Sequence, residues 1–115
     1  MSKPLRLSDL SPDRQALVRL CQEMNFGHIL GLEVKKGDPV LDPPPEVLLD
    51  VKLDADEGSR PELTLADFEL RIEVCRLLVR IDEVHNGWIE RLEVRHGTPV
   101  RAVFRRRPAD ATSSA

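Results

Sequence analysis

The cysteines and histidines of this sequence are its candidates for a nucleophile and its base: Cys21, Cys75, His28, His85 and His96. Covalent catalysis needs a nucleophile within reach of a base that a third group orients. Both cysteines fall in segments with helical apolar periodicity, where thiols are normally buried and inert. His85 is expected at a helix end and His96 in a turn, where both are structural or solvent-facing. We therefore expect a protein that is not an enzyme.

The sequence shows no other motif that is typical of a catalytic, phosphate-binding or metal-binding site. Glu33 and Glu93 recur at equivalent places and could form a carboxylate pair, but alternation puts both on a charged sheet face. Acids from Asp54 to Pro61 weakly resemble a calcium loop, which needs more residues and a distal bidentate glutamate. The chain has no glycine-rich phosphate loop and no metal-ligand spacing. We expect neither a cofactor nor a metal.

Arginines near the C-terminus are the strongest functional signal. Residues 91–107 contain six arginines and one acid, whereas residues 42–73 contain ten acids and three bases. Such a charge dipole favours a partner, or a second copy, with complementary patches. A basic patch is also what phosphate contacts need, so nucleic-acid binding is the alternative. Against it, the whole chain has a net charge of −3 and the patch lacks clear stacking aromatics.

The elements that must position these arginines belong to an internal repeat. Gly27–Val40 and Gly87–Val100 align without a gap and are identical at eight of fourteen positions. Chance would give on the order of one identity, so an internal duplication is the leading interpretation. The alternative is two independent hairpins of similar composition.

Each copy has the pattern of a β-hairpin, with a glycine at the start, alternating apolar residues and a glycine in the turn. A three-residue loop at Arg95-His96-Gly97 keeps apolar residues opposite apolar ones, with Ile89 facing Val103, and puts glycine at the left-handed position. In this register the core face carries Trp88, Leu92 and Val94. The outward face carries Ile89, Arg91 and Glu93, and Ile29 repeats the exposure of Ile89.

Two helices are predicted. Ser11-Pro12 is a helix start, and apolar spacing runs from Asp13 to Asn25. The second helix is expected from Leu65 to Asn86, after a Thr64–Asp67 cap, although residues 67–74 also alternate as a strand would.

Between the two copies, the run Pro43-Pro44-Pro45 has the composition of a rigid corner or of a polyproline ligand. Residues 47–53 then alternate as a half-buried strand does.

Together these elements predict an α+β fold built from a duplicated α-β-β unit. We expect a mostly antiparallel sheet of four or five strands with both helices on one face. The chain of 115 residues suits a single domain at 1–107, with repeats at about 11–53 and 64–106, and a disordered tail at 108–115.

The repeat motif resembles that of a known family. A short helix, then Asn25-Phe26-Gly27-His28-Ile29, an alternating strand and a turn at Gly37 resemble the YezD-like small bacterial proteins, whose function is uncharacterised. The resemblance covers about 30 residues of each copy, and the second copy departs from it at His85-Asn86. It implies a compact α-β-β unit that can pair with itself, and it supplies no catalytic residue.

Composition places the chain in a cytoplasmic, globular class. Hydrophobic residues make up 41% and charged residues 32%, with no apolar run of membrane-spanning length and no apolar stretch after the N-terminus. Two isolated cysteines suit a reducing compartment. We expect a non-enzymatic protein-interaction module that binds a protein partner or itself. The expected binding residues are Ile89, Arg91, Arg101, Val103 and Arg105.

Overall fold

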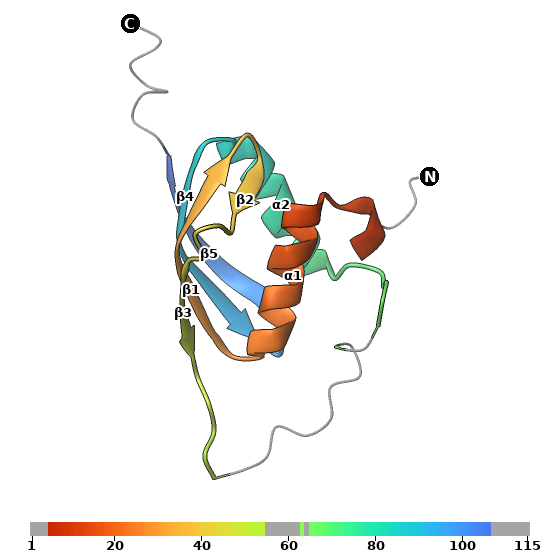
Figure 1. Ribbon diagram of the computed structural model, residues 1–115, viewed down its shortest axis with the longest axis vertical. Helices are drawn as coiled ribbons and strands as arrows, with labels where there is room; N and C mark the ends of the chain where they lie inside the picture. Colours follow the sequence, from red (N-terminus) through yellow and green to blue (C-terminus); the bar gives the residue numbers. More distant parts are fainter. Residues whose placement is uncertain (1–4, 55–62, 64, 107–115) are drawn as a thin grey trace, which may run out of the picture.

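The computed structural model of the protein describes residues 5–54, 63 and 65–106. Three sequence predictions lie outside the described residues: the calcium-like loop after Asp54, the Thr64 cap and the tail at 108–115. Across the described part, helices and strands follow one another in the order drawn in Figure 1. The elements are the 3-10 turn η1 (Leu7–Asp9), α1 (Pro12–Met24), β1 (Gly27–Lys35), β2 (Asp38–Val40), β3 (Glu46–Leu49), α2 (Ile72–Val84), β4 (Gly87–Arg95) and β5 (Thr98–Arg106).

The five strands form one antiparallel sheet in the order β2-β1-β4-β5, with β3 also paired to β1. Both helices cover the same face of this sheet, and no other element of the described residues covers the opposite face (Figure 1). The predicted α+β class, with two helices and a mostly antiparallel sheet, is confirmed.

The centre of the sheet is the pairing of β1 with β4. Gly27 lies opposite Val94 and Val34 lies opposite Gly87, so the first residue of the repeat motif in each strand meets the eighth in the other. Helices α1 and α2, and strands β1 and β4, have bounds that differ by 60 residues. Duplication as the origin of this correspondence stays a prediction.

The hairpin turn of each half contacts the helix end of the other half. The Gly37 N–H donates to the carbonyl of His85 at 2.9 Å, and the Gly97 N–H donates to the carbonyl of Asn25 at 2.8 Å. Asn25 and His85 are the C-cap residues of α1 and α2, with φ of 64° and 62°. These positive φ angles end each helix and leave a carbonyl for the turn glycine of the opposite half.

Both hairpin turns have two residues, and the expected three-residue loop is wrong. Lys35 pairs with Asp38, and Arg95 pairs with Thr98. The first turn residue, Lys36 or His96, has a φ of 53° or 52°, and the glycine after it has 77° or 73°. Positive φ at both turn positions is the type I′ geometry, whose twist matches that of the flanking strands.

The alternation of buried and exposed residues shifts by one within the central strands. Ile89 and Leu92 are both buried, although three positions separate them, because the β4–β5 register shifts between Ile89 and Arg91. Ile29 and Leu32 repeat this spacing in β1, and Gly31 between them has a φ of 67°. A β-bulge of this kind moves the following side chains to the opposite face. The predicted exposure of Ile29 and Ile89 is therefore wrong.

Strands β2 and β3 lie one after the other along the same edge of β1. Val40 is opposite Glu33, and Glu46 is opposite Leu30, so residues 41–45 bulge out between the two strands. Proline has no N–H for a strand ladder, which explains the gap and agrees with the predicted corner. The predicted strand at 47–53 is shorter in the structure and ends at Leu49.

The first helix begins as the sequence indicates. The Ser11 hydroxyl accepts from the Arg14 backbone N–H at 3.3 Å, and Pro12 is the first helical residue.

The second helix begins at Ile72, seven residues later than predicted, and the alternative strand at 67–74 is also absent. Residues before it bond to the N-terminal segment instead, with Leu7 N–H donating to Phe68 O at 2.9 Å and Leu70 N–H donating to Leu5 O at 2.8 Å. This long-range pairing replaces the first two turns of the expected helix.

The core lies between the two helices and the covered face of the sheet. Its fully buried members include Leu17, Ile29, Leu32, Ile81, Ile89 and Leu92. Burying aliphatic side chains of this size contributes about 1.5–3 kcal/mol each. Within the described ranges, neither helix has the length and apolarity to cross a bilayer.

Asp67 bonds to the N-terminal segment from the chain before α2. We expect this contact to make the free energy of unfolding depend on pH. The Arg6 guanidinium, followed by the Ser8 N–H, lowers the pKa of Asp67 to about 2. The folded pKa is below the unfolded value of about 3.9, so the stabilisation is present above pH 4 and is lost as pH falls toward 2. Asp67→Asn should lower the free energy of unfolding at pH 6, and the difference should shrink by pH 2.5 in urea melts.

Asp50→Asn is the matched control, because Asp50 is exposed and forms no ion pair with the described residues. An equal effect of Asp67→Asn at both pH values would contradict the assignment.

Candidate functional site

The uncovered face of the sheet is the first candidate site, and we call it the open face. Strand register defines its members, because cross-strand neighbours point to the same side of a sheet. They are His28, Leu30, Glu33, Val40, Glu46, Leu48, Trp88, Arg91, Glu93, Arg101, Val103 and Arg105.

These residues form three rungs that run across the strands. The first rung holds Val40, Glu33, Trp88 and Arg105. The second holds Glu46, Leu30, Arg91 and Val103. The third holds Leu48, His28, Glu93 and Arg101. The first two rungs place apolar side chains beside an arginine, with Trp88 beside Arg105, and Leu30 and Val103 on either side of Arg91. In the third rung, Glu93 lies between His28 and Arg101. Leu48 and Val103 are 48% and 43% exposed.

Arg105 is held by two contacts on this face. Its guanidinium carbon lies 4.8 Å from the centre of the Trp88 ring, and its Nε is 2.7 Å from Glu90 Oε1. Arg95, in turn, bonds Glu93 at 2.7 Å. Within residues 5–54 and 65–106, Arg91 and Arg101 have no ion pair. These two arginines can therefore meet an anion without first losing an internal partner.

Four of the five expected binding residues reach the open face: Arg91, Arg101, Val103 and Arg105. The fifth, Ile89, is wrong, because it has 0% exposure and packs in the core. Phe104 lies opposite Ile89, and Val103 lies opposite Arg91. The shorter turn and the two register shifts, one between Ile89 and Arg91 and one between Glu93 and Val94, together account for this exchange.

The predicted position of Trp88 on the core face is also wrong. It lies opposite Glu33 and Arg105 on the open face and is half-buried. The two repeated glutamates share this face but are not opposite one another, because Glu93 lies beside His28. No carboxylate pair forms between them.

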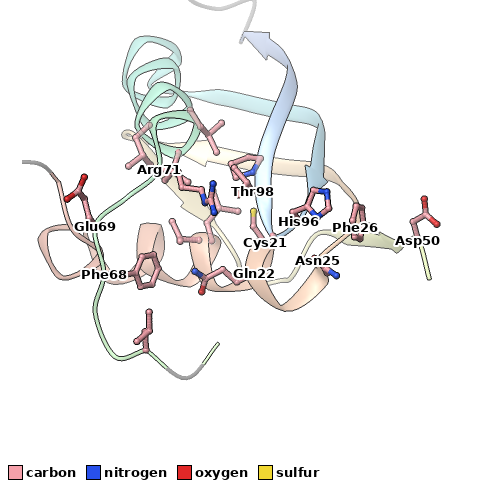
Figure 2. A pocket seen from close by; sticks show the side chains of 18 of the residues that line it. Cys21, Gln22, Asn25, Phe26, Asp50, Phe68, Glu69, Arg71, His96 and Thr98 are labelled. Atoms are coloured by element: carbon pink, nitrogen blue, oxygen red, sulfur yellow. The ribbon is translucent and has the colours of Figure 1, made fainter. Parts of the chain in front are cut away.

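The second candidate site is a pocket of about 860 Å³ that sequence reasoning missed. It lies between α1, the chain before α2, α2 itself and the β4–β5 turn. Figure 2 shows Phe68 and Glu69 at one end and Asp50 at the other, with Cys21 and Thr98 between them. Its volume falls within the range of small-molecule sites, about 300–1,000 Å³.

The pocket has an apolar interior and a charged rim. Its buried apolar residues are Leu17, Val18, Cys21, Val74, Leu77 and Leu78. Its buried polar residues are Gln22, Asn25 and Thr98. Among the described residues, the rim has two acids and two bases, Asp50, Glu69, Lys52 and Arg71. The formal charges of these four side chains cancel.

Three of the side chains considered as nucleophiles or bases, Cys21, His85 and His96, have structural surroundings. Cys21 is 1% exposed, and burial raises the pKa of its thiol to about 12, so the thiol stays protonated at neutral pH. His96 packs its ring against Phe26, with ring centres 4.7 Å apart, and His85 caps α2. Among the described residues, no three His, Cys, Asp or Glu side chains are grouped to hold a metal.

The two cysteines should differ sharply in reactivity. In native protein at pH 8, a thiol reagent such as DTNB should modify the half-buried Cys75 first. A Cys75→Ser variant should react about a hundredfold more slowly than an unfolded control, because Cys21 must be exposed by opening of the fold. Rapid native labelling of Cys75→Ser, followed by absorbance, would contradict a buried and protonated Cys21.

Comparison with known proteins adds no relative to this picture. No protein-family model matches the chain, and neither the curated proteins nor the solved structures give a match. The resemblance to the YezD-like family thus stays an interpretation of the sequence. The open face and the pocket are the two features that bear on function.

Proposed function

We propose that this protein is a small non-enzymatic interaction module that binds a protein partner through the open face. The observation that supports the proposal is that apolar side chains lie beside arginines in two of the three rungs of the open face. Interfaces are enriched in aromatic residues and arginine, and Trp88 with Arg105 supplies both at adjacent positions. Exposed apolar side chains gathered on one face also favour an interaction site.

A second copy of the chain is one suitable partner. The β5 side of the open face carries Arg101 and Arg105, while the opposite side carries Glu33 and Glu46. If two open faces meet about a two-fold axis parallel to the strands, the basic side of each covers the acidic side of the other. A two-fold contact of this kind uses the same patch twice, and its charges are complementary.

Self-association should weaken with salt and with loss of the β5 charge. Arg101→Glu should raise the dimer Kd by about tenfold or more, because it removes an attraction and adds a repulsion. Sedimentation or light scattering between 50 mM and 1 M NaCl measures the effect. The matched control is Arg76→Glu, an exposed arginine on α2, outside the open face.

A protein partner other than a second copy is tested with the same variants. Immobilised wild-type chain should retain that partner from a native extract, and Arg101→Glu should release it while Arg76→Glu should not. The proposal is contradicted if the chain is a monomer and retains no protein from the extract. It is also contradicted if Arg101→Glu retains the partner as well as the wild type does.

Nucleic acid is the second candidate partner, favoured by the position of Trp88. The ring lies on the open face beside Arg105, and bases of single strands stack on aromatic rings within basic surfaces. Arg91 and Arg101 add cations that have no ion pair within the described ranges. Each phosphate contact contributes to binding through counterion release.

The nucleic-acid candidate predicts retardation of a single-stranded oligonucleotide in a gel. Replacing Arg101 and Arg105 by alanine should lower the slope of log K against log salt by about 0.7 for each lost phosphate contact. Trp88→Leu should weaken binding by about 1–3 kcal/mol through lost stacking. Absence of retardation by the wild type at 50 mM salt rejects this candidate and leaves the protein partner.

A further inference from the structure

A polar cluster around Arg14 joins α1, the β1–β2 turn and α2. The Arg14 guanidinium donates twice to the Gly37 carbonyl, from Nε at 3.1 Å and from Nη2 at 2.6 Å. It also pairs with Asp82 and lies 3.6 Å from Asp38. The Ser11 hydroxyl donates to Asp38 at 2.8 Å. We call these five residues the Arg14 cluster.

The residues 60 positions away from the Arg14 cluster all line the pocket. They are Arg71, Val74, Gly97, Thr98 and Gln22, in place of Ser11, Arg14, Gly37, Asp38 and Asp82.

The backbone hydrogen bonds around the Arg14 cluster correspond to those around its pocket counterparts. The Gly37 N–H bonds the C-cap carbonyl of α2 at 2.9 Å, and the Gly97 N–H bonds that of α1 at 2.8 Å. The pocket therefore occupies the place that the Arg14 side chain fills in the other half.

Among the described residues, Val74 does not fill the place that Arg14 fills in the other half, and the carbonyl oxygen of Gly97 is left as a hydrogen-bond acceptor. Val74 has neither the length nor the donors of arginine. Within the described part of the chain, no group donates to the carbonyl oxygen of Gly97, whereas that of Gly37 receives two donors. A group that donates from the position that the Arg14 guanidinium takes in the other half would complete this arrangement, and matching this partly buried acceptor contributes about 0.5–1.5 kcal/mol.

The charges around the pocket select a neutral donor. Asp38 and Asp82 neutralise Arg14, but their counterparts Thr98 and Gln22 carry no charge. A cation bound at the position of the guanidinium would meet no carboxylate at position 98 or at position 22, and burying an unpaired charge is costly. The apolar interior, formed by Leu17, Leu77 and their neighbours, requires an apolar body for the rest of the molecule.

We propose that the pocket binds a small neutral molecule that has an apolar body and a terminal amide or urea group. Its N–H donates to the Gly97 carbonyl oxygen, as the Arg14 guanidinium donates to that of Gly37. The apolar body packs against Leu17, Cys21 and Leu77. This site lies on the helix side of the sheet and does not depend on the open face or on its partner.

Four matched probes test the chemistry: hexanamide, methyl hexanoate, hexanoate and hexylamine. They share an apolar chain and differ in the head group, which is a neutral donor, a neutral group without a donor, an anion or a cation. Titration of ¹⁵N-labelled protein should show saturable shifts of the Gly97, Thr98 and Cys21 amide signals with hexanamide. The other three should bind at least about fivefold more weakly.

A variant that refills the pocket gives the second arm. Val74→Arg combined with Thr98→Asp restores the pair that Arg14 makes with Asp38, and it should abolish the hexanamide shifts. Val79→Arg is the matched control, because Val79 is 55% exposed on the same helix, and it should bind as the wild type does. Dispersion of the amide spectrum shows whether each variant folds.

The ranking of probes on wild-type protein decides the proposal even if the double variant fails to fold. Equal binding of all four probes, shifts confined to residues outside the pocket, or no saturable shift would overturn it. Retained binding in a folded double variant would overturn it as well.

Discussion

The antiparallel pairing of β1 with β4 is the contact on which the rest of the structure depends. It joins the two halves of the chain into one sheet, and it places each hairpin turn beside the helix end of the other half. The two turn glycines donate to C-cap carbonyls that helix geometry would otherwise leave without a partner. Neither half satisfies these groups alone, so sheet, turns and caps stabilise one another.

The same arrangement produces two surfaces with different properties. On the helix side, the side chain at position 14 or 74 decides whether the space between helix and turn is filled by arginine or left as a pocket. On the other side, none of the described helices covers the sheet, and β5 contributes its arginines to that surface. Small differences between corresponding positions thus set the character of each face, because the backbone around them is alike.

Local pattern predicted the helix α1, the strand order of each hairpin and the class of the fold, since caps, periodicity and glycine positions are local signals. It failed where geometry depends on distant partners or on one extra residue. Ile89 was misplaced because alternation assumes an unbroken strand, and β4 contains a bulge. The start of α2 was misplaced because Leu70 bonds to Leu5, which no local pattern reveals. The pocket needed the contacts of Arg14 to become visible, although the substitution of Val74 for it was present in the sequence.

The two edges of the sheet are unequal, and this limits how chains can join. The outer edge of β5 spans nine residues and contains a register shift next to Val100, whereas the other edge is divided into β2 with three residues and β3 with four. A chain that adds a strand to β5 cannot offer an equally long edge at its far side, because residues 41–45 interrupt it. The far edge therefore offers only short, separated stretches of backbone, and broken edges of this kind disfavour the addition of further strands.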